Sequence, residues 1–499
     1  MIEHLMPHLP VLLIAIPLIA APLLILIGNR RLVALLSLIV AWVVFAISLS
    51  LLGRVLIEGA FEYQLGGWES PYGIVYRVDS FNAFVMLFVS ALGALVLTYA
   101  PHSIAVEIPK SKHYLFYPSY LLCLTGLLGM CVTGDLFNVF VFLEISSLSS
   151  YALISLGKTR RAPLASFQYL VLGTIGATFF LLGIGLLYQI TGTLNMADIA
   201  EKLAASDSKR TELVAFAFMT VGLFIKMAVF PLHTWLPNAY TYAPSVVTTF
   251  IAATSTKVSV YAFARMVYMI FTPTFAFETL PLDRAMVVLA LIGIFVASIA
   301  AIYQTNVKRL LAYSSVAQIG YMLLGLGLAT EAGVAAGVVH MFNHAFIKGG
   351  LFMVVGCFAL RIGSVRLQDL NGAATTMPWT CFAWAVGGLG LIGVPMTAGF
   401  VSKLMLLTAT MDEGNLLVAM LMLISSLLAV VYVWKVVEAI YFAEPSEKVK
   451  AAKEAPLAML IPTYLVIGAT VVFGCWTVYS AEIAQLAAHA LLNLNGGIH

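Results

Sequence analysis

Two lysines interrupt long apolar stretches of this sequence, and no acidic residue lies between them. Lys226 follows an apolar run and precedes Pro231, and Lys257 lies near the middle of the next apolar segment. An ammonium group inside a bilayer costs about 3 kcal/mol on insertion scales, so ionisable side chains within membrane spans usually serve an ion or proton path. Because proline lacks an N–H and breaks helices, Pro231 also predicts an interrupted helix beside Lys226.

A carboxylate, Glu144, lies in the middle of another apolar stretch, GDLFNVFVFLEISSLSSYALISLG. The only other acidic residue of that stretch, Asp135, is near its outer end, so the partner of Glu144 must come from another helix. A lysine of a neighbouring span is the expected partner, because buried charges persist when they are paired or hydrogen-bonded. Such a pair could serve only to lock two helices together, but its position inside the membrane favours a role in transport.

The segment HMFNHAFIKGG places His340, His344 and Lys348 on one face of a helix, at positions i, i+4 and i+8. Histidine titrates near neutral pH and exchanges protons at either ring nitrogen, so this face could relay protons. A metal site is the main competitor, since HxxxH is a zinc spacing, but Met341 stands where the glutamate of HExxH would be. A haem ligand or a hydrogen-bonded core histidine also remains open.

Polar residues of NVKRLLAYSSVAQIGYM could support such a relay. Gln318 does not titrate but could orient a water molecule between charged groups, and Ser315 could hydrogen-bond water or a neighbouring helix. Polar contacts between membrane helices are common and contribute under about 2 kcal/mol each. We therefore expect a structural role for the serine.

One further lysine completes the set of candidate proton-transfer residues. Lys403 follows the glycines and Pro395 of GLIGVPMTAGFVSKLML. Asp79 opens an apolar span and could be a helix N-cap or a place where ions enter, and Asp135 is similarly ambiguous. The predicted proton-transfer set is Glu144, Lys226, Lys257, His340, His344, Lys348 and Lys403.

The composition places these residues in a membrane protein that spans the bilayer many times. Of the 499 residues, 62% are apolar and 10% charged, and the mean hydropathy of +1.00 excludes an ordinary soluble protein. The five cysteines form no CxxC pair, so we expect neither a disulfide framework nor a zinc site. A formal charge of +3 gives no reason to expect nucleic acid as a partner.

Apolar windows of about 20 residues predict about fourteen spans. Most loop lysines and arginines then lie on the side opposite the termini, so both termini are expected on the outer side of the membrane. The tail AEIAQLAAHALL is weakly amphipathic and is expected at the surface. The predicted spans are 8–28, 32–53, 80–100, 113–133, 136–157, 164–191, 212–231, 244–269, 285–304, 309–329, 332–360, 379–410, 416–442 and 457–480.

Two groups of five spans predict an inverted repeat with a discontinuous helix in each copy. Lys226 and Pro231 lie in the fourth span of the first copy, and Pro395 and Lys403 lie in the fourth span of the second. An odd number of spans inverts the second copy, as in transporters whose broken helices form ion sites near the midplane. The predicted divisions are an N-terminal three-helix segment (1–112), the first repeat (113–270), the second repeat (284–442) and a C-terminal helix and tail (443–499).

Several ordered motifs resemble one known family over about residues 60–445. The chain is similar to the proton-conducting antiporter-like subunits of complex I and of Mrp-type multisubunit cation/proton antiporters, most closely to the D-type subunit of the latter. Gln318 departs from the pattern, because some members have histidine there. The motifs are TGDLFNVFVFLE around Glu144, KMAVFPLHTWLPNAY around Lys226, the span of Lys257, LLAYSSVAQIGYM, HMFNHAFIKGGLF, and GGWESPYGI ahead of Asp79.

The resemblance implies an all-α fold of fourteen helices with two inverted five-helix bundles. It further implies a Glu144–Lys226 pair and proton stations at Lys257, at His340 or His344, and at Lys403. The expected function is proton translocation within a monovalent cation (Na⁺ or K⁺)/proton antiporter of the cell membrane, together with other membrane subunits. The threonine-rich loop NAYTYAPSVVTT keeps a complex I-like redox complex open as the alternative, either an NADH:quinone oxidoreductase or a membrane-bound hydrogenase. In either case we expect no cofactor and no redox centre in this chain.

Overall fold

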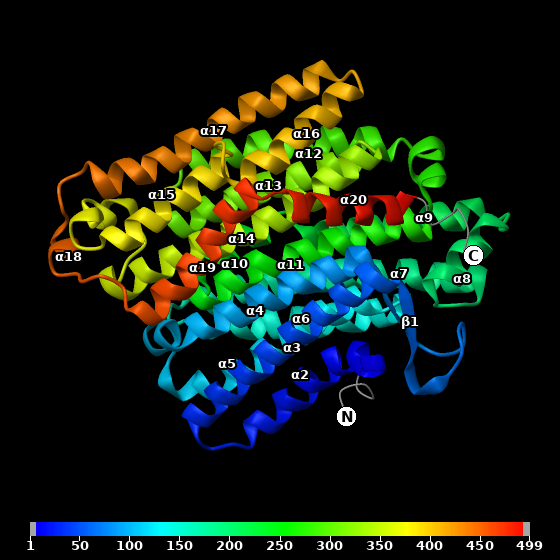
Figure 1. Cartoon of the computed structure of the whole chain (residues 1–499), viewed down its shortest axis with the longest axis horizontal. Coiled ribbons are helices and arrows are strands. Elements are labelled where there is room, and N and C mark those ends of the chain that lie inside the picture. Colours follow the sequence, from blue (N-terminus) through cyan, green and yellow to red (C-terminus); the bar gives the residue numbers. More distant parts are fainter. Residues whose placement is uncertain (1–5, 493–499) are drawn as a thin grey trace.

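The protein is a bundle of long helices with one small β-hairpin. The computed structural model describes residues 6–492. Most helices run roughly along the longest axis of the molecule, with α2 and α3 at one edge and α17 at the other (Figure 1). The predicted all-α polytopic fold is confirmed. The hairpin pairs β1 (Phe61–Gln64) with β2 (Val75–Val78) in antiparallel register.

The helices follow one another as long rods with short connections. In the first half of the chain they are α2 (Leu9–Ile25), α3 (Arg30–Glu58), α4 (Ser80–Glu107), α5 (His113–Val132), α6 (Leu136–Ser155), α7 (Arg161–Thr191), α8 (Met196–Ala204), α9 (Lys209–Met227), α10 (Trp235–Tyr242) and α11 (Ser245–Arg265). In the second half they are α12 (Leu282–Ile302), α13 (Val307–Gly327), α14 (Glu331–Ile362), α15 (Pro378–Ile392), α16 (Ala398–Asp412), α17 (Leu416–Tyr441), α18 (Glu447–Lys450), α19 (Leu457–Cys475) and α20 (Val478–Leu492).

Twelve helices of the described residues are long and apolar enough to cross a membrane. Each overlaps one of the predicted spans. The two remaining predicted spans correspond to α9, whose sequence carries several charges, and to the interrupted pair α15 and α16. The number fourteen and the inverted relation of the two five-helix groups stay predictions.

Two helices are interrupted where the sequence predicts a break. The helix α9 ends at Met227, the next residue Ala228 adopts a left-handed conformation (φ 61°), and Pro231 follows before α10 begins. The helix α15 ends before Gly393, whose φ of 89° favours glycine, and Pro395 lies before α16. Each break leaves the last carbonyl groups of a helix without partners in that helix.

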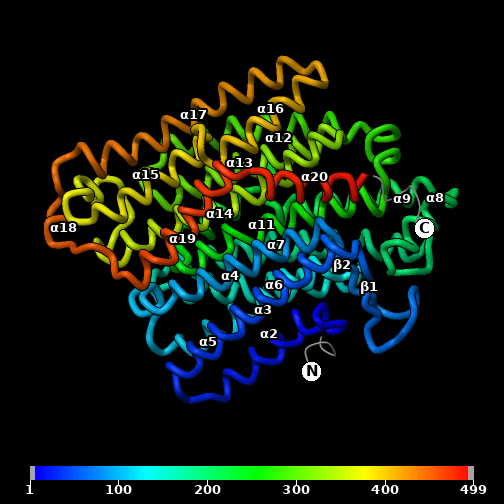
Figure 2. Tube along the Cα trace, viewed as in Figure 1, coloured from blue at the N-terminus to red at the C-terminus, as the bar shows by residue number. Residues whose placement is uncertain are grey.

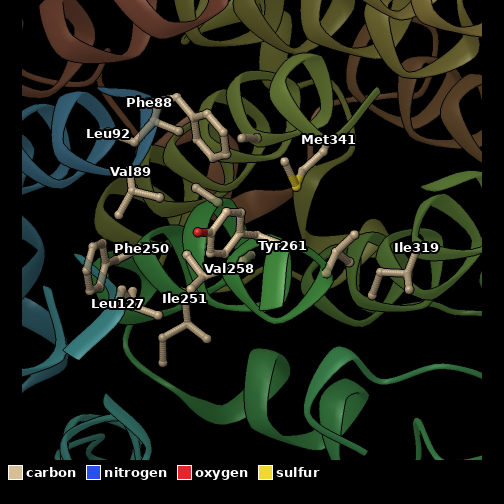
Figure 3. Close-up of a cluster of buried hydrophobic side chains, with 14 of the residues drawn as sticks. Phe88, Val89, Leu92, Leu127, Phe250, Ile251, Val258, Tyr261, Ile319 and Met341 are labelled. Atoms are coloured by element: carbon tan, nitrogen blue, oxygen red, sulfur yellow. The ribbon is translucent and has the colours of Figure 1, made fainter. Parts of the chain in front are cut away.

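The core of the bundle is formed by α4, α5, α11, α13 and α14. The span that contains α11 is buried along its whole length, and most of α13 and α14 is buried as well. Figure 3 shows apolar side chains of this core, with the ring of Tyr261 among Phe88, Val258 and Met341. Because this core surrounds α11, the Lys257 side chain is held away from lipid.

Small residues let some helices approach closely. A Cβ placed on Gly222 of α9 would lie 2.5 Å from the carbonyl oxygen of Gly176 on α7, so both backbones nearly touch there. Close contact through glycine is a common way to pack helices in membranes. The contact fixes α9, and with it Lys226, against α7.

The last helix packs one face against the bundle. After α19, α20 contacts α4 and α14 (Figure 2), and its other face, which includes Tyr479 and Leu486, is exposed, so its expected surface position stays a prediction. Its buried residues are small and recur at helical spacing, namely Ser480, Ala484, Ala487, Ala488 and Leu491. Residues 1–5 and 493–499 lie outside the described part, so the expected side of the two termini is not tested.

The two ends of the bundle differ, and we name them by their content. The hairpin end carries β1, β2, the starts of α4 and α6, and the end of α11. It is tied together by the backbone hydrogen bond from Gly134 N–H to the Val75 carbonyl and by the pairing of Tyr76 with Thr133. The opposite end carries the end of α4 and the starts of α11 and α13. Under the predicted orientation, the hairpin end faces the outside.

Candidate functional site

The predicted pair of Glu144 and Lys226 is present. The Lys226 ammonium on α9 lies 3.8 Å from the Glu144 carboxylate on α6. It donates shorter hydrogen bonds to Ser147 Oγ (2.7 Å) and Tyr151 OH (3.3 Å). Ser147 and Tyr151 follow Glu144 by three and seven positions, so all three lie on one helical face. Lys226 is buried, whereas a quarter of the Glu144 side chain is exposed, so this end of the site approaches the lateral surface.

Both helix breaks place an ammonium group at the carboxyl end of a half-helix. Lys226 belongs to the last turn of α9. Lys403 on α16 donates hydrogen bonds to the carbonyl oxygens of Ile392 (2.8 Å) and Leu391 (3.4 Å), the last residues of α15. The carboxyl end of a helix carries partial negative charge and free carbonyl groups, which favour a cation. The breaks therefore offset part of the cost of burying these lysines.

Lys257 and Lys348 are both fully buried and bind polar groups of the core. Lys257 donates to the carbonyl oxygen of Ala252 in its own helix, with Thr256 Oγ1 at 3.5 Å. Lys348 on α14 donates to Ser314 Oγ and to the Leu311 carbonyl oxygen of α13. Among the described residues, neither lysine has a carboxylate within ion-pair distance. Both ammonium groups are therefore held by neutral oxygen acceptors alone.

The two predicted histidines stack along α14. Their ring centroids are 6.1 Å apart and the rings are nearly parallel. His340 Nδ1 lies 2.9 Å from Ser402 Oγ of α16, and its ring is 5.4 Å from the ring of Tyr321 on α13. Both ring nitrogens of His344 are buried without a protein hydrogen-bond partner. Within residues 6–492, no group of three or more His, Cys, Asp or Glu side chains is placed to hold a metal ion.

Lys403 connects the histidines with a cavity near the surface. Its ammonium lies 5.2 Å from the ring centroid of Tyr321, the same ring that neighbours His340. Ser426 Oγ lies 3.4 Å from the ammonium. A cavity of about 140 Å³ adjoins Lys403 and is lined by Tyr321, Ser426, Phe400 and apolar side chains. Lys403 therefore has room for water beside it.

The structure thus brings the predicted residues into two groups. Glu144 and Lys226 form the first, and His344, His340 and Lys403 form the second, joined through Ser402 and Tyr321. Lys257 and Lys348 lie on helices of the core between them. No hydrogen bond within residues 6–492 joins Lys226 directly to Lys257.

The predicted supporting residues have mainly structural contacts. Asp79 is the N-cap of α4 in a capping box with Asn82, and Asp135 is the N-cap of α6, accepting from Asn138 N–H. Burial raises the pKa of the Asp135 carboxyl. Ser315 donates to the Leu311 carbonyl oxygen of its own helix, as expected for a structural serine. Gln318 is buried on α13.

Several contact residues were not singled out from the sequence. Ser147 and Tyr151 hold Lys226, and Ser402 holds His340. Helical spacing from Glu144 could have indicated the first two, but the contact of Ser402 depends on which helices meet. His233, which follows the break after α9, also has a buried Nδ1 without a protein partner.

The fold and these buried charges define an antiporter-like membrane protein with broken helices. Residues 133–429 match the family described as "NADH:quinone oxidoreductase/Mrp antiporter, TM", and the chain belongs to this family. A Desulforudis audaxviator protein named NADH-quinone oxidoreductase subunit N is 40% identical over 485 residues, 93% of this chain and 95% of that protein. The D-type subunit of the Na(+)/H(+) antiporter of Bacillus subtilis is 30% identical over 489 residues, 98% of each chain.

Solved structures show the same architecture. A chain of the membrane-bound sulfane sulfur reductase, an archaeal respiratory membrane complex, superposes with a TM-score of 0.89 at 34% identity over 97% of both chains. A chain of the Mrp complex from Dietzia sp. superposes with a TM-score of 0.90 at 26% identity over 98% of both chains. A chain of respiratory complex I from Thermus thermophilus, 24% identical, has the same fold with a TM-score of 0.77.

Proposed function

We propose that this chain is the proton-translocating subunit of a multisubunit monovalent cation/proton antiporter in the cell membrane. The observation that carries the proposal is the Glu144–Lys226 pair at a helix break, followed across the core by buried lysines and histidines. Ionisable groups inside membrane spans are rare, and they usually mark an ion or proton path. The matching length of the Bacillus subtilis antiporter protein supports the antiporter assignment.

The first step is a change of partner by Lys226. Its ammonium sits between the Glu144 carboxylate and the oxygens of Ser147 and Tyr151. A proton or cation that reaches the part-exposed Glu144 weakens the attraction of the carboxylate for Lys226. Unit charges ~7 Å apart at an effective dielectric constant of about 20 interact by ~2 kcal/mol, more than tenfold in a proton equilibrium. A shift of the Lys226 charge therefore changes the proton affinity of Lys257 and of the titratable groups beyond it.

The later steps use the lysines and histidines beyond Lys226. Lys257 and Lys348 can each release a proton and become neutral amines. The stacked His344 and His340 can pass a proton to Lys403, which adjoins a cavity with room for water. Each transfer leaves the donor ready to be protonated again. This row of residues, from Glu144 to Lys403, can therefore operate repeatedly.

The proposal includes other membrane subunits as partners. The solved relatives are chains within larger complexes, and the first and last members of the row approach the surface of this chain at Glu144 and Lys403. A neighbouring protein of the complex can therefore deliver or accept charge at either place. Lipid, protons and Na⁺ or K⁺ are the remaining partners.

A second candidate is a proton-pumping subunit of a redox complex. It is favoured by the 40% identity to a protein named NADH-quinone oxidoreductase subunit N and by the 34% identity to a chain of the sulfane sulfur reductase. In that case, flavin or iron–sulfur subunits would supply the free energy, and this chain would use the same row of residues.

Reconstitution of the complete complex distinguishes the two candidates. The complex is purified through this chain, its subunits are identified, and it is placed in vesicles that contain a pH-sensitive dye. An imposed Na⁺ or K⁺ gradient alone should move protons. Proton movement that occurs only with an electron donor would favour the redox complex. No proton movement with either the cation gradient or the electron donor would reject proton translocation.

A further inference from the structure

We propose that the carboxyl end of α15 is a binding site for a monovalent cation, Na⁺ or K⁺, which competes with the ammonium of Lys403 for the same oxygen atoms. This inference rests on the proposed antiporter function and names the place in this chain where the exchanged cation binds. Three observations carry it: the carbonyl groups at the helix break, the neutral oxygens around Lys403, and the cavity beside the ammonium.

The last carbonyl groups of α15 have no backbone partner. In a continuous helix, the carbonyl oxygen of Leu391 would accept from residue 395 and that of Ile392 from residue 396. Residue 395 is a proline without an N–H, and Met396 has left the helix with a φ of 70°. Within residues 6–492, these two oxygens accept hydrogen bonds only from Lys403 Nζ, at 3.4 and 2.8 Å. They therefore depend on Lys403 or on a cation that replaces it.

The other oxygen atoms around the ammonium are neutral as well. Ser426 Oγ of α17 lies 3.4 Å from Lys403 Nζ, and the hydroxyl of Tyr321 lies 3.5 Å from Ser426 Oγ. Among the described residues, Lys403 has no carboxylate within ion-pair distance. Sites for divalent cations usually contain carboxylates, whereas neutral carbonyl oxygens bind K⁺ in channels. The oxygen set therefore suits a cation of single charge.

The end of α15 also favours a cation electrostatically. The carboxyl end of a helix carries partial negative charge. In transporters with discontinuous helices, such ends and the unwound carbonyl groups beside them coordinate the transported ions. The break between α15 and α16 has this arrangement, and the ammonium of Lys403 marks the position of the bound charge.

The cavity beside Lys403 provides room for the exchange. It measures about 140 Å³, and its lining includes Ile392, Gly393, Tyr321 and Ser426. Several water molecules fit in this volume and can complete the coordination of an ion. A Cβ on Gly393 would lie 3.0 Å from Lys403 Cδ, so the glycine leaves space for the lysine side chain to move. Because Lys403 is part-exposed, the site can be reached without opening the core.

Competition between the two charges would couple the cation to the proton. The ammonium and the cation repel each other and use the same carbonyl groups, so only one of them binds at a time. When a cation enters, Lys403 gives one proton to a water molecule of the cavity, and the neutral amine moves off the carbonyl oxygens. When the cation leaves, the amine takes up one proton and returns. One N–H bond is broken and re-formed in each cycle, and no electrons are transferred.

A lysine that only stabilises the break predicts a different result. Its removal would leave the two carbonyl groups to water, and cation binding would not depend on the residue at position 403. In the proposed site, the neutral side chain of Lys403→Ala frees the oxygens for a cation at any pH. The fixed charge of Lys403→Arg blocks them at any pH.

The test measures equilibrium binding of radioactive sodium and rubidium ions to the complete purified complex at low and high pH. Wild-type binding should increase severalfold at high pH. Lys403→Ala should bind equally at both pH values, and Lys403→Arg should lose the binding that Lys403→Ala shows. Adding Ser426→Ala to Lys403→Ala should weaken this binding severalfold. Thr408→Val is the matched control on α16, because the Thr408 hydroxyl binds only carbonyl groups of its own helix.

Equal cation binding by the wild type, Lys403→Ala and Lys403→Arg would overturn the site. If Lys403→Ala fails to assemble, Ser426→Ala in the otherwise wild-type chain decides. It should weaken binding at high pH severalfold while Thr408→Val does not, and unchanged binding would overturn the site. Failure of the proposed function is seen separately, in vesicles where a cation gradient moves no protons. Cation-driven proton movement without binding that depends on Lys403 would overturn the site alone.

Discussion

The ammonium of Lys403 lies 2.8 Å from the carbonyl oxygen of Ile392, across the break between α15 and α16. This contact stabilises the break, and under the proposed function it also places a proton carrier there. The two roles can be separated, because a cation that cannot lose its proton would keep the contact and lose the transport.

Lys403→Arg is the corresponding substitution. Arginine keeps a positive charge that the carbonyl groups of α15 can bind, but it does not release a proton. We expect near-normal assembly and thermal stability with loss of nearly all proton transport, measured by melting in detergent and by dye-loaded vesicles. Normal transport would show that Lys403 acts only as a structural cation.

The contact between α7 and α9 gives a prediction about stability. Gly222→Ala places a methyl group against the Gly176 backbone and should destabilise the protein by roughly 1–3 kcal/mol through overpacking. Gly185→Ala on α7 is the matched control, because nothing lies within 4 Å of its Cβ position. The melting temperatures of both variants test this, and equal values would contradict the close contact.

A buried cluster at the opposite end links three core helices. The Glu107 carboxylate of α4 accepts from the backbone N–H and hydroxyl of Ser245 on α11 (2.8 Å each) and from Lys308 of α13 (3.3 Å). Glu107→Gln leaves Lys308 without its counter-ion and should cost about 3 kcal/mol of stability. The exposed pair of Arg54 and Glu58 is the control, since Arg54→Gln should cost under about 1 kcal/mol.

Much of the fold follows from the sequence because membrane spans are read from long apolar runs. The broken helices were also predictable, since Pro231 and Gly393 interrupt apolar sequence beside lysines. The neighbours of α20 were not predictable, because its small buried residues indicate a packed face but not that α4 and α14 cover it.

The site was predictable to the extent that an ionisable residue in a span is unusual. Glu144 and Lys226 stand out for this reason, whereas Ser402 looks like any serine until α16 meets His340. Arg265 lies within a span, but the sequence does not reveal that it reaches Asp79, almost two hundred residues earlier. Long-range pairing of this kind depends on helix packing and not on local pattern.

The arrangement of the two histidines yields a prediction about metals. His340 binds Ser402, and the described residues include no third ligand beside His340 and His344. We expect the purified protein to hold no stoichiometric zinc and chelators to leave transport unchanged, as measured by elemental analysis and vesicle assays. One tightly bound metal per chain that is lost in His344→Ala would instead support a metal site.

The central claim is that the buried charges, beginning with Lys226, carry transport. The most direct measurement compares Lys226→Ala with Lys435→Ala in vesicles that contain equal amounts of assembled complex. Lys435 is a matched lysine in α17 that binds the carbonyl groups of Ile302 and Gln304 (2.9 and 3.1 Å) at the end of α12. We expect Lys226→Ala to abolish proton transport and Lys435→Ala to retain most of it. Near-normal transport by Lys226→Ala would contradict the account.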